Sequence, residues 1–121
     1  MPGLAEPISH YTDAVQAGHL LFVSGCVPVD GEGALVGGND VVAQARQVFG
    51  NVGAVLAAAG AGFGDVVKVT VYLTDVDDRA RINPVRQELF GETRPASTLI
   101  EVSRLAVAGA RIEVDAVAVV G

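Results

Sequence analysis

The strongest constraint in this sequence is a long run with apolar residues at helical spacing. The recurring apolar positions are Val41, Ala45, Val48, Val52, Val55 and Ala59. Asn39 and Asp40 stand just before the run and are good N-cap residues, while Gly60 stands where a C′ glycine ends a helix. The pattern predicts one long amphipathic helix over residues 40–60.

Runs of β-forming residues lie on both sides of this helix. Residues His19–Ser24 are mostly apolar, and Asp13–Gln16 is expected to pair with them in a hairpin across Ala17 and Gly18. Residues 28–40 are rich in glycine, which predicts a loop with at most a small hairpin.

The run Val66–Leu73 alternates between two sets of side chains. One set is Val67, Val69, Val71 and Leu73, and the other is Lys68, Thr70 and Tyr72. Because alternate residues of a strand point to opposite faces, this run predicts a strand with one buried face.

The second half of the chain continues the mixture of helix and strand. Pro84 interrupts residues 77–90, so we expect one turn over 77–82 and a helix that begins after Asn83 as its cap. Thr98–Leu105 and Arg111–Val119 are expected to be strands. The order β, β, α, β, α, β, β predicts an α+β fold, one domain over residues 1–121 with helices packed on one face of a sheet.

Composition adds an expectation about assembly. Half of the 121 residues are hydrophobic and 18% are charged, below the ~25% that is usual for soluble chains. A small domain has proportionally more surface to cover with polar groups. The apolar excess therefore suggests that other copies of the chain cover part of the surface.

Charge and cysteine content exclude several classes of function. The net charge of -6 and the scattered basic residues give no groove for nucleic acid and no attraction to an anionic membrane. Cys26 is the single cysteine, and His10 and His19 lack the spacing of a helical zinc pair, so we expect no disulfide and no metal site. With no signal peptide or membrane span expected, the predicted location is the cytoplasm.

The residues themselves carry no strong catalytic motif. Glu113 and Asp115 lie two apart on the last predicted strand, so both side chains project to one face. Such a pair is more often solvated, and a catalytic role requires that this face lines a cleft. Cys26 has no nearby cation in sequence and is interpreted as an inert thiol. The pair His10 and Tyr11 fits a pocket mouth and a surface strand equally well.

Several segments resemble the RidA/YjgF family, also called the L-PSP family. These segments are Ser24–Asp30, Ala43–Gly60, Asp65–Asp78, Arg94–Ala106 and Arg111–Val119. The resemblance implies a chorismate-mutase-like α+β fold with a mixed sheet. It also implies a homotrimer with a small-molecule pocket between neighbouring subunits. Members of the family hydrolyse reactive imines and enamines to keto acids and ammonia without a cofactor.

The resemblance also implies a set of site residues. Tyr11 resembles the family's N-terminal tyrosine, Ser24 with Gly25 its serine-glycine turn, and Asn83 its asparagine before the second helix. Asp115 stands where active members usually carry a glutamate that positions water, so it is the predicted catalytic residue.

The chain departs from the family at the residues that bind the substrate carboxylate. Active members read roughly Pro-Ala-Arg-[Ser/Thr]-[Cys/Thr], whereas this chain has Ser97, Thr98 and Leu99 in the last three positions. Without the arginine, a carboxylate in a partly dry pocket has no paired cation. We therefore expect little hydrolysis of 2-aminoacrylate or 2-iminopropionate, and partial recovery in Ser97→Arg. Arg94 is a weak substitute because Pro95 holds it in an extended stretch.

Three functions remain open from the sequence. The first is a divergent imine or enamine deaminase that acts on a small metabolite other than the usual 2-imino acids. The second is a non-catalytic trimer that binds a small metabolite or has a regulatory role. The third is an RNA-directed translation inhibitor, which the acidic composition disfavours.

Overall fold

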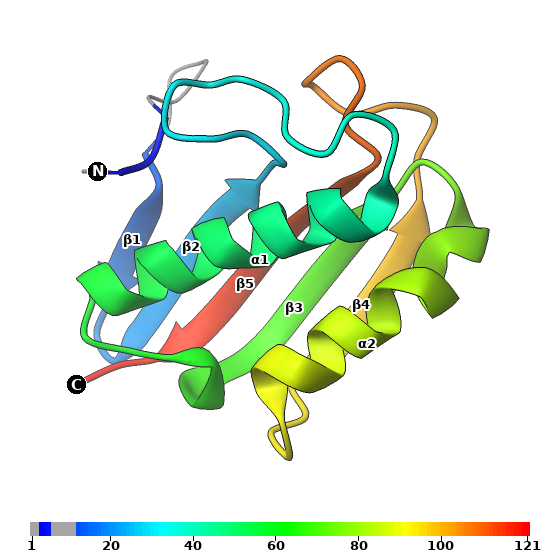
Figure 1. Cartoon of the computed structure of the whole chain (residues 1–121). Coiled ribbons are helices and arrows are strands. Elements are labelled where there is room, and N and C mark those ends of the chain that lie inside the picture. Colours follow the sequence, from blue (N-terminus) through cyan, green and yellow to red (C-terminus); the bar gives the residue numbers. More distant parts are fainter. Residues whose placement is uncertain (1–2, 6–11) are drawn as a thin grey trace.

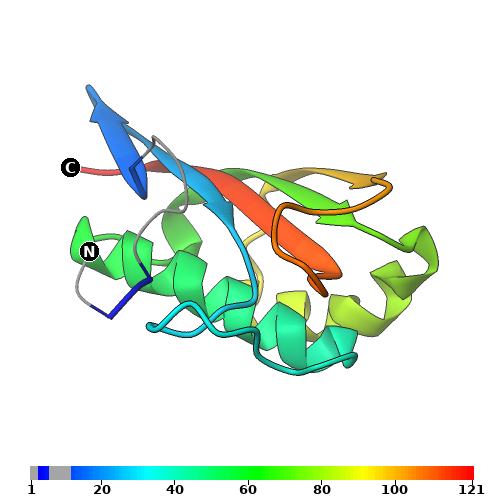
Figure 2. The same ribbon diagram turned by 90° about the horizontal axis from the view of Figure 1, so that it is seen from above.

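A computed structural model of the chain describes residues 3–5 and 12–121. Its sheet has the strand order β1-β2-β5-β3-β4. The strands are β1 (Ala14–Ala17), β2 (Leu20–Cys26), β3 (Val66–Leu73), β4 (Ala96–Glu101) and β5 (Ile112–Val119). The helices α1 (Val41–Ala58) and α2 (Arg79–Phe90) lie side by side across one face of the sheet (Figure 1), and from above the sheet and the helices form two layers (Figure 2). The predicted α+β fold, with two helices on one face of a mixed sheet, is confirmed.

The sheet is mixed because of one crossover connection. Strand β5 lies antiparallel between β2 and β3, and β1 pairs with β2 as the predicted hairpin. Strands β3 and β4 are parallel. Parallel neighbours cannot be joined by a tight turn, and α2 supplies the connection between them. The edge strands are β1 and β4.

The core lies between the sheet and the two helices. Alternate residues of the central strands are buried there, together with the apolar stripe of α1. From the two central strands the core takes Val69, Val71, Leu73, Ile112, Val114, Ala116 and Ala118. The ring of Phe90 at the end of α2 packs edge-on against Phe49 of α1, with ring centroids 6.0 Å apart, and this contact fixes α2 beside α1.

Helix α1 has the ends that its sequence predicts. The Asp40 carboxylate accepts hydrogen bonds from the backbone of Val42 at 2.9 Å and Ala43 at 3.3 Å, which caps the first turn. At the other end Gly60 adopts φ 76°, and Ala61 N–H donates to the Leu56 carbonyl at 2.9 Å. This is the glycine-terminated C-cap expected from the sequence.

Helix α2 begins earlier than the sequence predicts. A short 3-10 turn at Val76–Asp78 leads directly into the helix at Arg79, and Pro84 lies inside it rather than at its start. Asn83 is therefore not a cap. The proline removes only the hydrogen bond to the Ala80 carbonyl, and both residues are exposed, so water can reach that carbonyl. Burial of Ile82 and Val85 against the core favours a continuous helix.

Two further predictions about strands need correction. Strand β4 covers Ala96–Glu101 rather than Thr98–Leu105, because its partner β3 ends at Leu73 and offers no further pairing. Val67 was expected on the buried face but is 46% exposed, because the register shifts between Val66 and Lys68. A bulge of this kind moves one residue to the opposite face.

Neither α1 nor α2 covers the opposite face of the sheet (Figure 2), which we call the open face. Its apolar half lies towards one end of the strands and contains Val15, Leu20, Phe22, Val67 and Val119, which are 40–55% exposed. Its polar half lies towards the other end of β2, β3 and β5. Within the described residues, no helix is long and apolar enough to cross a membrane.

Candidate functional site

The polar half of the open sheet face gathers an acidic cluster, which we define as Glu113, Asp115 and Tyr72. Glu113 and Asp115 are alternate residues of β5, and Tyr72 of β3 pairs with Glu113 across the sheet. The Tyr72 hydroxyl donates a hydrogen bond to Asp115 Oδ2 at 2.9 Å. The two carboxyls therefore project side by side from one strand, and one of them is held by a phenol.

Gly25 brings the end of β2 close to this cluster. A Cβ atom at position 25 would overlap the Glu113 carboxylate as it lies here, so the glycine leaves room for this side chain beside the backbone of β2. The register of β2 against β5 shifts between Val23 and Cys26, which places Gly25 in an irregular part of the strand. The sequence offers the glycine, but only the fold reveals that it faces Glu113.

The surroundings of Glu113 change its ionisation. Burial raises the pKa of the Glu113 carboxyl, and the nearby negative charge of Asp115 raises it further. Burial also raises the pKa of the Cys26 thiol to about 12, with added repulsion from Asp13, Glu113 and Asp115. The hydrogen bond to Asp115 raises the pKa of Tyr72. The site is therefore acidic and partly dry, and one of its carboxyls binds a proton more readily than a free glutamate does.

Ser24 lies beside Gly25 at the edge of the same region. Its hydroxyl donates to the Thr12 carbonyl at 2.6 Å, which ties β2 to the segment just before β1. Tyr11, the neighbouring residue in the sequence and a predicted site residue, lies outside the described residues.

A second group of predicted residues lies on the helix side of β4. Ser97 pairs with the core-facing Val69 in parallel register, so its side chain points towards the helices. There its Oγ accepts a hydrogen bond from the Arg86 guanidinium of α2 at 2.8 Å. Leu99 is half-buried against the core, and Asn83 is exposed on α2 one turn before Arg86.

Thr98 points the other way, as expected for a residue between Ser97 and Leu99. Its Oγ accepts from Lys68 Nζ at 2.6 Å on the open face of the sheet. A single chain thus divides the predicted residues into two groups. Ser24, Gly25, Thr98 and Asp115 belong to the open face or its edge, whereas the helix-side group is Asn83, Ser97 and Leu99.

Sequence reasoning singled out Glu113 but chose Asp115 as the catalytic residue, and it missed Tyr72 and Arg86. The alternation of β5 already placed Glu113 on the same face as Asp115, so that signal was present. Tyr72 and Arg86 gave no comparable signal, because their contacts with Asp115 and Ser97 depend on strand pairing and on helix docking.

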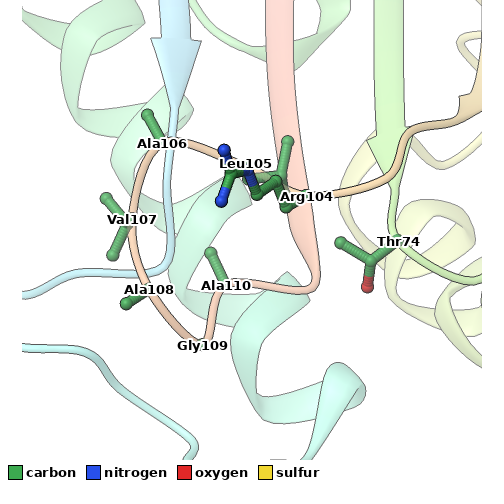
Figure 3. Close-up of a pocket in the computed structure, with 8 residues that line it drawn as sticks. All are labelled: Thr74, Arg104, Leu105, Ala106, Val107, Ala108, Gly109 and Ala110. Carbon is green, nitrogen blue, oxygen red and sulfur yellow. The ribbon is translucent and has the colours of Figure 1, made fainter.

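A separate cavity of about 440 Å³ lies beyond the end of β3. It is lined by Thr74 and by residues 104–110, which form a curved loop. In Figure 3 the side chain of Arg104 lies inside the curve of this loop. None of the predicted site residues lines it. No cluster of three or more metal-ligating side chains occurs in the part of the chain that the structure describes.

Comparisons with known proteins agree on one family. The family model Endoribonuclease L-PSP matches residues 3–120. A RutC family protein from Pyrococcus horikoshii is 44% identical over 93% of this chain and 89% of its own length. The 2-iminobutanoate/2-iminopropanoate deaminase of Salmonella typhimurium is 41% identical over 93% of this chain and 88% of its own. The crystal structure of Escherichia coli TdcF with bound serine is 35% identical, with a TM-score of 0.89 over 98% of this chain and 94% of that one.

Proposed function

Because this chain belongs to the RidA/YjgF (L-PSP) family, in which some relatives are named 2-iminobutanoate/2-iminopropanoate deaminases, we propose that it hydrolyses imines or enamines. We further propose that its substrate is a small metabolite other than the usual 2-imino acids. The observation that carries the proposal is the partly buried pair Glu113 and Asp115, with the pKa of Glu113 raised, beside Gly25.

This cluster suits the proton transfers of imine hydrolysis. As water attacks the carbon of the protonated imine, its proton passes to a carboxylate, and the electron pair of the C=N double bond moves onto nitrogen. The same proton then goes to the nitrogen of the tetrahedral intermediate. The C–N bond breaks with its electrons on the departing ammonia, and the hydroxyl proton is released as the carbonyl forms. A carboxyl whose pKa is raised exchanges protons more readily near neutral pH.

We assign this proton transfer to Glu113. Asp115 was the residue expected from the sequence, and we retain it as a catalytic candidate that positions the attacking water. Its Oδ2 already accepts the Tyr72 hydroxyl, which restrains its rotation, and its charge helps to raise the pKa of Glu113. Asp115 thus acts both directly and through its neighbour.

The restriction on substrates follows from charge. A carboxylate attached directly to the imine carbon would lie close to Glu113 and Asp115, where like charges repel. Position 97, where the family resemblance implies an arginine in active members, is a serine in this chain. We therefore propose substrates without a carboxylate on the imine carbon.

We also propose that a homotrimer in the cytoplasm is the active form. The exposed apolar half of the open face, with Phe22 at 46% exposure, supports burial against other copies. The separation of Asp115 from Ser97 on opposite faces of one sheet supports a pocket that a neighbouring copy completes. A small molecule between subunits is the partner that this arrangement would take.

A second candidate is a trimer that binds a metabolite without catalysis, and the serine at position 97 favours it. The two candidates differ in the effect of removing Glu113. Imines generated in situ by amine or amino-acid oxidases serve as substrates, with ammonia release as the measurement. The deaminase proposal predicts that Glu113→Gln loses most of the turnover and that the exposed Glu92→Gln retains it. Equal rates in both variants would rule out the assigned role, and no turnover of any imine by the wild type would favour the binding protein.

A further inference from the structure

Arg86 is a half-buried cation whose charge is not paired with a carboxylate among the described residues. Of the other arginines, Arg46 pairs with Glu88, and both Arg81 and Arg111 pair with Asp78. The remaining three, Arg79, Arg94 and Arg104, are exposed to solvent. The hydrogen bond that Arg86 makes is to an uncharged group, from its NH2 atom to Ser97 Oγ at 2.8 Å. A guanidinium has five N–H donors, so most of its donor capacity is left for another partner.

Because Arg86 is half-buried, its lack of a carboxylate partner is unusual. Burial alone lowers the pKa of Arg86, which means that the protein withdraws water from the charge without supplying a counter-ion. A partly desolvated charge is costly unless it is paired. A bound anion would supply the missing charge.

We propose that Arg86, oriented by Ser97, is the anion-binding and specificity-determining residue of this chain, and that it takes the carboxylate of a small organic acid. The planar fork of a guanidinium matches the two oxygens of a carboxylate. One arginine balances one negative charge, which favours a monocarboxylate over a dianion such as phosphate. The half-buried Leu99 and the exposed Asn83 nearby provide an apolar and a polar neighbour for the rest of the molecule.

The position of this guanidinium defines the substrate class. An arginine at position 97 would extend its guanidinium outward from β4 by the length of its side chain. Arg86 instead reaches position 97 from α2 and places its NH2 atom against the short serine side chain. The bound carboxylate therefore lies closer to the strand than it would beside an arginine at position 97. This step rests on the proposed deaminase function: the carboxylate would be attached to the substrate at an atom other than the imine carbon.

Arg104 at the cavity near Thr74 is the competing candidate. It is exposed, and it makes no ion pair or hydrogen bond with any residue that the structure describes. Arg104 and Arg86 carry the same charge but lie at different places, so Arg104→Gln is a matched control for Arg86→Gln. Loss of anion binding in one variant but not in the other shows which of the two arginines binds the anion.

The test measures binding of butanoate to the full chain by calorimetry or by NMR titration, with uncharged butanamide as the matched ligand. We expect butanoate to bind and butanamide to bind far more weakly. Loss of a charge-assisted hydrogen bond predicts that Arg86→Gln weakens butanoate binding by roughly ten- to a hundredfold, and that Arg104→Gln leaves it unchanged. Ser97→Ala should weaken binding less than Arg86→Gln, because it removes the positioning contact and leaves the charge.

Several results would overturn the assignment. These are no butanoate binding, equal binding of butanamide, unchanged binding in Arg86→Gln, or loss of binding in Arg104→Gln. If Arg86→Gln fails to fold, Arg86→Lys replaces it: the charge remains but the fork is lost, so affinity should still fall, and an unchanged affinity would contradict the proposal. The measurement involves no turnover, so failure of the deaminase function would leave its expected result intact.

Discussion

Glu113 shows how one side chain acquires its chemistry from its neighbours. Its strand places it beside Asp115, and Gly25 allows the end of β2 to cover it. Both effects oppose its negative charge, which is why the pKa of Glu113 is raised. The same effects predict how the stability of the fold depends on pH.

The first prediction concerns Glu113→Gln and the free energy of unfolding. In the unfolded chain the carboxyl has its ordinary pKa of 4.5, and in the folded chain that pKa is raised. Between the two pKa values the folded state binds more protons, so the wild type loses stability as pH rises through this window. Above the folded-state pKa, Glu113 is ionised in the folded protein, and the destabilisation by its partly buried charge has reached its full value. Glu113→Gln should therefore be more stable than the wild type at pH 8, and this advantage should disappear below the ordinary pKa.

Denaturant unfolding of both proteins across this pH range provides the measurement. Glu92→Gln, which removes a charge at an exposed position, serves as the control and should show little pH-dependent difference. An advantage of Glu113→Gln that grows at acidic pH would contradict the assigned sign.

The sequence predicts some of the site residues better than others. Alternation along β5 predicted that Glu113 and Asp115 share a face, because strand geometry is local. The same alternation puts Ser97 and Leu99 on one face of β4. It could not tell which face this was, since that depends on the pairing of β4 with β3. The contact between Arg86 and Ser97 depends on the docking of α2 and had no local signal.

At the scale of elements, one ion pair fixes several segments together. Asp78, at the start of α2, is only 2% exposed and accepts a hydrogen bond from Arg111 just before β5, at 2.6 Å. Arg111 also donates to the Asn39 carbonyl at 2.8 Å, just before the cap of α1. Gln44 of α1 accepts from the backbone of Arg111 at 2.7 Å. The starts of α1, α2 and β5 therefore meet at these two charges.

The second prediction compares this pair with a surface pair. Asp78→Ala leaves Arg111 partly buried and unpaired, so it should lower the free energy of unfolding by about 3 kcal/mol. Glu88→Ala breaks the pair with Arg46, in which both side chains are more than half exposed, and should lower it by less than about 1 kcal/mol. Chemical denaturation at one fixed protein concentration checks both. Similar losses in the two variants would mean that Asp78 does not hold these elements together.

The elements also differ in how far the sequence predicts them. Helix α1 was predicted closely because its cap, its apolar stripe and its final glycine agree. Helix α2 was not, because Pro84 gives a local signal for a helix start that burial of Ile82 and Val85 overrides. Strand β4 was predicted to run too far, because its end is set by the end of its partner β3.

At the scale of the whole molecule, the third prediction is the proposed trimer. Light scattering at micromolar concentration should give about three times the 12.3 kDa of one chain. Phe22→Asp places a charge in the exposed apolar half of the open face and should dissociate the assembly. Leu35→Asp, on the loop after β2, adds the same charge outside the sheet and should leave it intact. A wild-type mass of one chain would refute the trimer.

The proposed function is that of an imine deaminase whose site does not suit 2-imino acids. Its most direct test compares ammonia release from 2-iminopropanoate with release from the imine of 4-aminobutanoate, each generated in situ by an oxidase and corrected for spontaneous hydrolysis. We expect turnover of the second imine, and we expect kcat/KM for 2-iminopropanoate to lie roughly two orders of magnitude or more below that of a relative that carries an arginine at position 97. A drop of this size corresponds to loss of a paired cation worth about 3 kcal/mol. Turnover of 2-iminopropanoate at the rate of that relative, or no turnover of either imine, would contradict the proposed function.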